Sequence, residues 1–170
     1  MEHTHSALAS AILITWKRNG LYAQRLVGGL ADHDWTAQPV PGRVLNHPSW
    51  IFAHLNVYTP ICTAMLCGER FTDPIDHPFG QKSEVSTDPH VYRPAQQLLS
   101  DFATLHTEAE ESLASATDSL MAASNPLERW RAIHPTIGDM LVTLMVKHES
   151  GHLGQLSTWR RAKGLPRVAV

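Results

Sequence analysis

Two histidines near the end of the chain, His148 and His152, are spaced for joint chemistry. Residues four apart on a helix lie on the same face, one turn above the other. That face also carries Met145 and Leu156, so the pattern places both imidazoles where core residues are expected. Two unpaired imidazoles in a core would incur a desolvation cost. They therefore need either separate hydrogen-bond partners or a shared metal ion.

A third histidine, His54, occupies the same kind of position on another apolar stripe, between Ile51 and Tyr58. If the two helices pack together, the three imidazoles can meet at one point. Three nitrogen ligands with an open fourth position are typical of a catalytic site for zinc or a similar divalent ion. The alternative is that each histidine is a core residue satisfied by its own hydrogen bond. The sequence thus nominates His54, His148 and His152 as metal ligands.

The run from His148 to His152 also matches the H-E-x-x-H signature of zinc proteases, in which a glutamate acts as general base. Those enzymes take their third ligand from downstream, but residues 153–170 contain no His, Asp or Glu. Protease activity is therefore not expected. Glu149 is the carboxylate nearest the ligands in sequence, and as a catalytic residue it would orient a ligand or shuttle a proton. Its alternative is a solvated glutamate on the helix surface.

Four amphipathic helical stretches must position these groups, and no strand-like alternation competes with them. Their apolar residues recur at helical intervals in residues 4–29, 47–68, 94–123 and 136–164. Two proline-containing loops, 31–46 and 69–92, connect the first three helices, and the longer loop is a candidate lid. Stripes on four long helices are buried most economically in a bundle. We therefore predict an all-α four-helix bundle with a long loop between its second and third helices.

The composition fits one globular domain and excludes several function classes. Of 170 residues, 43% are hydrophobic and 18% are charged, which is enough apolar material for a core and too little charge for disorder. The net charge of -2 offers no basic surface for nucleic acid. The start lacks the regions of a secretory signal, and no stretch reaches about 18 uninterrupted apolar residues. We expect a cytoplasmic protein without nucleic-acid or membrane partners.

The remaining cysteines and histidines are assigned no chemistry. Cys62 and Cys67 form neither a disulfide framework nor a paired zinc motif, and we expect them to be buried small hydrophobic residues. Seven histidines lie in expected loops, at the terminus or off the stripes and are expected to be solvated: His3, His5, His33, His77, His90, His106 and His134.

Several motifs together resemble the DinB-like (DinB/YfiT) superfamily. They are Pro41-Gly42, Trp50-Ile51-x-x-His54-Leu55, His148-x-x-x-His152-x-Gly154-Gln155-Leu156 and Arg160-x-x-x-Gly164-Leu165-Pro166. The resemblance spans nearly the whole chain and implies a single DinB-like domain over residues 1–170. It also implies a four-helix bundle in up-down-down-up order. One divalent metal would be held by one histidine of the second helix and two of the last, which map onto His54, His148 and His152.

The resemblance also implies a small-molecule reaction. Understood relatives are metal-dependent transferases or isomerases that use low-molecular-weight thiols such as bacillithiol, mycothiol or glutathione. We therefore expect a metal-dependent transferase or hydrolase acting on a small molecule, with such a thiol as the co-substrate that the resemblance suggests. Three imidazoles suit zinc or nickel first, with iron or copper as alternatives. The substrate would enter between the loops 31–46 and 69–92.

A second hypothesis keeps the metal but not the catalysis. The three histidines would then form a structural site closed by a fourth protein ligand, or a vestigial site, in a non-catalytic metal-binding or interaction protein. An enzyme would instead keep the fourth position open. The resemblance also suggests a homodimer.

Overall fold

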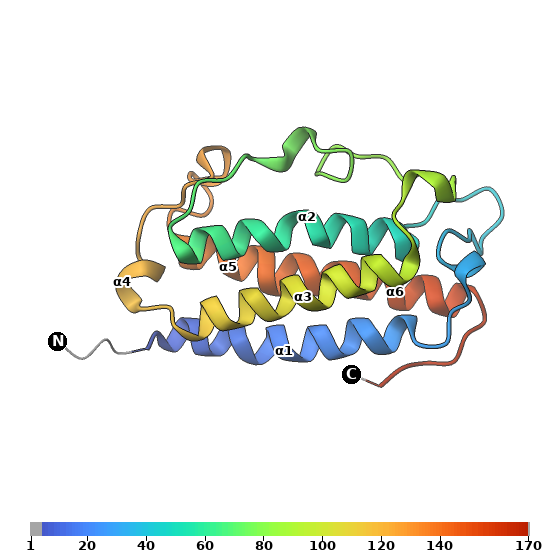
Figure 1. Ribbon diagram of the computed structural model, residues 1–170, viewed down its shortest axis with the longest axis horizontal. Helices are drawn as coiled ribbons and strands as arrows, with labels where there is room; N and C mark the ends of the chain where they lie inside the picture. The colour runs from blue at the N-terminus through green and yellow to red at the C-terminus, as the bar shows by residue number, and fades with distance from the viewer. Residues whose placement is uncertain (1–4, 170) are drawn as a thin grey trace.

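The computed structural model describes residues 5–169, and its long helices lie side by side (Figure 1). The first three are α1 (Ala7–Val27), α2 (Pro48–Cys67) and α3 (Ala95–Ala114), and a one-turn helix, α4 (Asp118–Met121), follows them. A fourth rod is continuous through α5 (Ile137–Leu141), a π-helical segment (Val142–His148) and α6 (Glu149–Ala162). Within residues 5–169 there is no strand beyond two isolated bridges, so the predicted all-α class is confirmed.

The four long elements enclose one core. In Figure 1, α1 and the fourth rod run from left to right, whereas α2 and α3 run from right to left. α3 packs against both α1 and α2, and the fourth rod packs against the same two helices. α3 and the fourth rod therefore stand at opposite corners of the assembly. The long connection from α2 to α3 returns along the outside of α2 (Figure 1).

Local signals in the sequence set several helix ends. His47 caps α2 by accepting a hydrogen bond from a backbone N–H of the first turn. Thr136 and Asp139 form the predicted capping box at the start of α5. Gly68 ends α2 with φ 69° and Gly164 follows α6 with φ 78°. These left-handed conformations cost glycine nothing, so both helices end as predicted.

The third helix is shorter than predicted. The pattern predicted a helix over 94–123, but α3 ends at Ala114 and a break precedes α4. The Ser115 hydroxyl donates back to carbonyls of the preceding turn, and Thr117 begins α4 as its N-cap. Such side-chain bonds compete with helix propagation. The segment before α1 occupies the break, because the Ser6 N–H donates to the Ala116 carbonyl at 3.0 Å.

The fourth rod contains the π-helical segment, which the sequence pattern did not predict. Its seven residues end at His148, the first of the two neighbouring histidines. A π-helix closes its hydrogen bonds one residue later than an α-helix and therefore turns the following residues relative to the preceding ones. π-helical segments occur frequently at functional sites.

The buried residues form two hydrophobic clusters with a polar layer between them. One cluster includes Ile12, Met65, Leu113 and Met145, and the other includes Leu26, Phe52, Phe102, Leu153 and Trp159. Along α1, α3 and the fourth rod, the residues between these two sets include buried or half-buried polar side chains: Asn19, His106, His148, Glu149 and His152. On α2, the buried His54 lies at the end of the second cluster, between Ala53 and Leu55, and completes this polar layer. The polar layer is therefore where this bundle departs from a simple apolar core.

Within the described part of the chain, α2 alone is long and apolar enough to span a membrane by length and composition. However, 72% of its apolar window is buried inside the structure, as expected of a core helix.

Candidate metal centre

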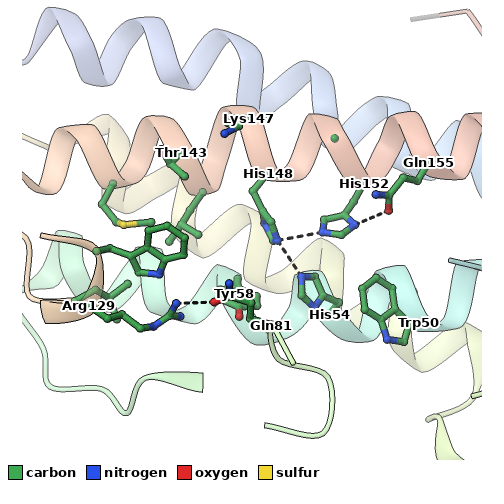
Figure 2. A pocket seen from close by; sticks show the side chains of 15 residues that line it. Trp50, His54, Tyr58, Gln81, Arg129, Thr143, Lys147, His148, His152 and Gln155 are labelled. Carbon is green, nitrogen blue, oxygen red and sulfur yellow. Dashed lines mark hydrogen bonds between the residues drawn. The ribbon is translucent and has the colours of Figure 1, made fainter. Parts of the chain in front are cut away.

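The three nominated histidines meet on one side of the polar layer (Figure 2). The Nε2 atom of His148 lies 2.9 Å from Nε2 of His54 and 3.1 Å from Nε2 of His152. One ligand atom from each residue lies within 4.8 Å of the other two. α2 supplies His54, and the junction of the π-helical segment with α6 supplies the other two. The structure thus brings together all three residues predicted from the sequence.

Two of the three rings are fixed in one tautomer by their surroundings. Nδ1 of His54 lies 2.7 Å from the Phe79 carbonyl oxygen, which can only accept, so this Nδ1 carries the proton. Nδ1 of His152 donates in the same way to Oε1 of Gln155 at 2.9 Å. That oxygen also accepts a hydrogen bond from the side-chain amide of Asn46 at 2.8 Å. Both Nε2 atoms therefore present lone pairs.

This arrangement fits a shared cation better than hydrogen bonds among the rings. Nε2 of His148 can donate one proton, and it faces lone pairs of both His54 and His152. A hydrogen bond from His148 could satisfy only one of these two lone pairs, and the other would face a nitrogen atom. A divalent ion, in contrast, can accept a lone pair from each of the three nitrogen atoms. Two nitrogens bound to one tetrahedral zinc at 2.0–2.1 Å lie about 3.3 Å apart. The observed separations are close to that value, so the three histidines can hold a metal ion.

Burial keeps the cluster in the neutral form that a metal requires. Burial is the main cause that lowers the pKa of His54 to about 4 and that of His148 to about 3, with nearby histidines adding to the effect. Burial also lowers the pKa of His152, against its hydrogen bond to Gln155, which raises the pKa. The Trp50 ring stacks on His54 with centroids 4.7 Å apart and shields it from solvent.

Metal-free protein is expected to lose stability as the pH falls from about 6.5 to 4. Unfolded histidine has a pKa near 6.5, while folded His54 takes up its proton only near pH 4. Because the pKa of His54 is lower in the folded state, the residue contributes free energy of unfolding that is fully present above pH 6.5 and is lost on acidification. The loss for this residue is up to about 1.4 kcal/mol per pH unit. Thermal melts in a chelator from pH 8 to 4 measure the loss. His54→Ala must show a shallower loss than wild type, and equal slopes would contradict the assignment.

A pocket of about 410 Å³ opens beside the cluster. Its walls include Trp50, Tyr58, Trp130 and Leu144, and no aspartate or glutamate lines it. Among the described residues, no Cys, Asp or Glu and no fourth His joins the three ligands. The side of the site that faces the pocket is therefore free of protein ligands of these types.

Of the two loops expected to flank the substrate entrance, only one lines the pocket. The loop 69–92 contributes Gln81 to the pocket, but no residue of 31–46 lines it. The connection between α4 and α5 replaces that loop and contributes Leu127, Arg129 and Trp130. The 31–46 loop instead reaches the site indirectly, through the hydrogen bond from Asn46 to Gln155.

Glu149 is buried and contacts α3 instead of lining the pocket. It is 1% exposed and does not line the pocket, so the solvated alternative is wrong and its position gives no support to a catalytic role. Its Oε1 lies 3.3 Å from Nε2 of His106. Burial raises the pKa of Glu149, while the hydrogen bond from His106 lowers it. Glu149 therefore belongs to a polar contact between α6 and α3.

His106 is buried, contrary to the prediction that it is solvated. It is 7% exposed, and its ring stacks on Trp16 with centroids 3.7 Å apart. The interval between Phe102 and Ala109 on the buried face of α3 contains this position, but the sequence pattern gave no sign of a polar partner across the bundle. The partner lies on another helix, so this contact depends on how the helices pack and not on the periodicity of one helix.

The other histidines and the cysteines take up scattered positions. His5, His33, His77 and His90 are exposed as predicted, His134 is half-buried, and His3 lies outside the described residues. Cys62 is buried as predicted, but Cys67 is exposed. Burial raises the pKa of the Cys62 thiol, with Glu149 adding to the effect, so this thiol stays protonated.

Several residues around the site were not predicted from the sequence. Gln155 and Trp50 belong to the quoted motifs, and Tyr58 follows His54 by four residues on the same stripe, so a pattern existed for these three. Arg129 and the Phe79 carbonyl lie in segments without periodicity, and nothing in the sequence marked them. Both groups reach the site only because of the course that these irregular segments take through the structure.

Comparison with known proteins agrees with the geometry. The DinB superfamily matches the chain over residues 16–156, which include all three clustered histidines. No curated protein and no solved structure matches the chain. Because the match covers most of the sequence, the chain belongs to the DinB superfamily.

Proposed function

We propose that this protein is a divalent-metal-dependent enzyme, a transferase or hydrolase that acts on a small molecule with a low-molecular-weight thiol as co-substrate. The observation that carries the proposal is the open side of the three-histidine cluster, which faces a pocket of about 410 Å³. A structural metal is normally closed by a fourth protein ligand, whereas catalytic sites leave a position for water or substrate. Zinc or nickel is the proposed ion, and iron and copper also suit imidazole ligands.

A divalent ion at this site would supply one chemical effect: it lowers the pKa of a bound thiol or water and makes a nucleophile near neutral pH. The protein's own residues shape the surroundings. Trp50, Trp130 and Leu144 provide apolar walls that limit water. Burial raises the pKa of Tyr58, so its hydroxyl stays protonated and can donate a hydrogen bond to a substrate in the pocket.

Two finer features belong to the same proposal. One is the DinB/YfiT-type four-helix bundle in up-down-down-up order, which the helix directions in Figure 1 support. The other is a homodimer. A monomer in light scattering at micromolar concentration would rule out the dimer without affecting the metal site.

The function is tested by turnover of untagged protein loaded with zinc or nickel. Glutathione, bacillithiol and mycothiol are each offered with 1-chloro-2,4-dinitrobenzene, a general electrophile. The thiol sulfur forms the new bond to carbon, chloride leaves, and the thiol proton passes to the buffer. An ester panel without thiol tests hydrolysis. We expect metal-dependent turnover by the wild-type protein with one of these thiols. His152→Ala should show no turnover with any of them.

Metal-loaded protein that turns over neither the thiol pairs nor the esters would contradict the proposal. It would favour the non-catalytic metal-binding alternative. Turnover of esters alone would identify a hydrolase and remove the thiol from the proposal.

A further inference from the structure

The hydrogen bond that orients His54 comes from a loop, whereas the one that orients His152 comes from its own helix. The turn formed by residues 73–83, in the connection between α2 and α3, passes beside the cluster and points the Phe79 carbonyl at His54. The distance from this oxygen to Nδ1 of His54 is 2.7 Å, a short hydrogen bond. The carbonyl therefore sets both the tautomer and the orientation of the ring. In metal sites, a hydrogen bond to the ring nitrogen that does not bind the metal commonly sets the tautomer and orientation of the histidine.

Gly80, directly after Phe79, is required by the shape of this turn. Gly80 is buried, and a Cβ on it would lie 2.0 Å from the Pro74 carbonyl oxygen and 3.1 Å from that of His77. Both obstacles are backbone atoms, so no side-chain rotation can relieve the clash. Any larger residue must move the turn, and the Phe79 carbonyl moves with it.

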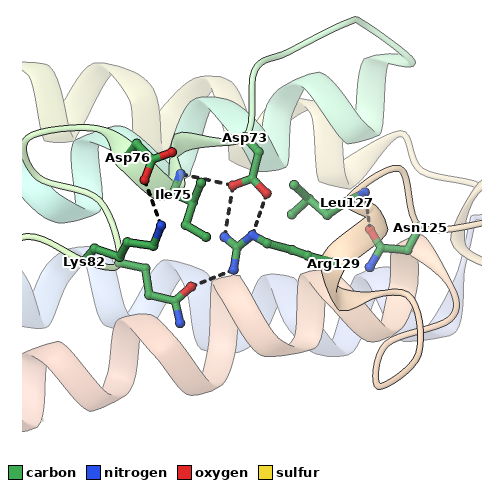
Figure 3. Close-up of polar contacts among 8 residues, drawn as sticks. Asp73, Ile75, Asp76, Lys82, Asn125, Leu127 and Arg129 are labelled. Atoms are coloured by element: carbon green, nitrogen blue, oxygen red, sulfur yellow. Dashed lines mark hydrogen bonds and ion pairs between the residues drawn. The ribbon is translucent and has the colours of Figure 1, made fainter.

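The turn is held together by its own hydrogen bonds. The Gly80 N–H donates to the His77 carbonyl at 2.7 Å, and the His77 N–H donates to the Pro74 carbonyl at 3.0 Å. The Ser83 hydroxyl donates to the Gly80 carbonyl at 2.7 Å. Asp73 accepts from the Ile75 N–H at 3.1 Å (Figure 3). These hydrogen bonds therefore hold the turn in one defined conformation.

Arg129, from the connection between α4 and α5, binds this turn through its guanidinium group (Figure 3). Its guanidinium donates to both carboxylate oxygens of Asp73, with Nη2 to Oδ1 at 3.0 Å, and through Nη1 to Oε1 of Gln81 at 2.6 Å. The arginine and aspartate side chains are 23% and 32% exposed, so the pair is partly shielded from solvent. A bidentate pair of this kind fixes geometry as well as contributing energy.

We infer that the turn 73–83 is a positioning device for the metal ligand His54, with Gly80, Asp73 and Arg129 as its positioning residues. Gly80 lets the turn close, Arg129 and Asp73 hold it against the α4–α5 connection, and the Phe79 carbonyl keeps the proton of His54 on Nδ1. Nε2 is then left to bind the ion. The inference rests on the metal site of the proposed function and assigns part of that site to a loop.

The test compares Gly80→Ala with Gly28→Ala in untagged full-length protein. Gly28 is a matched control because it also lies in a connection, has φ -57°, and would place its Cβ no closer than 3.4 Å to any neighbour. The first measurement is the tautomer of His54 by nitrogen NMR in chelator, which needs no metal. The second is zinc affinity by competition with a chromophoric chelator. Circular dichroism and melting temperature confirm folding.

Gly80→Ala should lose the Nδ1-protonated form of His54 and bind zinc about 10- to 100-fold more weakly, the usual effect of removing a partner of a ligand histidine. Gly28→Ala should match wild type in both. Arg129→Gln, which adds no volume, should shift both readouts in the same direction.

An unchanged His54 tautomer in Gly80→Ala, or unchanged zinc affinity alongside zinc-binding wild type, would overturn the inference. If Gly80→Ala fails to fold, Arg129→Gln decides by the same two readouts. A wild-type protein that binds no metal would refute the proposed function, while the tautomer comparison would still decide whether the turn positions His54.

Discussion

Replacing His148 with alanine should abolish metal binding while the protein stays folded. Its Nε2 is the central atom of the cluster, 2.9 Å from that of His54 and 3.1 Å from that of His152. Without it two nitrogens remain, which is fewer than zinc sites in proteins normally use. The apolar clusters on either side of the polar layer are untouched by the change. The melting temperature of metal-free protein should therefore change by less than about 5 °C.

Elemental analysis of untagged protein measures the metal, beside His54→Ala, His152→Ala and the control His33→Ala. The His33 side chain is 81% exposed, so this control should carry as much metal as wild type. Wild type should carry about one transition-metal ion per chain and each ligand variant a background amount. Wild type that cannot be loaded would show that the three are core histidines. A melting temperature that collapses in a chelator would favour a structural metal.

The second large effect is expected on stability, from Glu149→Ala. The carboxylate is 1% exposed and contacts His106, which is itself 7% exposed. Removing the carboxylate leaves His106 without its partner and leaves a cavity in the core, and together these losses cost about 3–5 kcal/mol. For a chain of this size that corresponds to roughly 6 to 20 °C in melting temperature. Glu149→Gln keeps the shape and an acceptor, so it should cost less than about 1.5 kcal/mol.

Urea unfolding of Glu149→Ala, Glu149→Gln and the control Glu108→Ala measures these differences. Glu108 is exposed on α3, and its loss should be nearly neutral. Zinc affinity of Glu149→Gln should equal that of wild type, because the side chain does not line the pocket. If Glu149→Gln instead keeps its stability and zinc but loses turnover, Glu149 acts in the reaction, as its place beside His148 in the sequence suggests.

His148 and Glu149 are neighbours with different surroundings. The imidazole of His148 lies at the pocket with the other two ligands, whereas the carboxylate of Glu149 crosses the core to α3. Both lie where the π-helical segment meets α6. The contact with His106 therefore anchors the helix on one side while the ligands face the pocket on the other.

The helices and the three-histidine cluster could be predicted from the sequence because both depend on regular spacing. Apolar stripes fix which face of a helix is buried, so periodicity alone placed His54, His148 and His152 on core-facing positions. The four-residue interval between two of them puts both on one face regardless of how the helices pack. Capping residues such as Thr136 act over a single turn, so the start of α5 was also predictable.

Only the tertiary structure decided what lies around those ligands. Glu149 looked like a site residue because it adjoins His148 in sequence, yet side chains one position apart on a helix do not share a face. Its buried partner His106 lies on another helix and is invisible to periodicity. The Phe79 carbonyl and Arg129 reach the site along irregular connections, whose path depends on contacts such as the close approach of Gly80 to Pro74. Local periodicity in the sequence therefore predicted which three histidines come together, while the pocket and the hydrogen bond that orients His54 arise from contacts between distant segments.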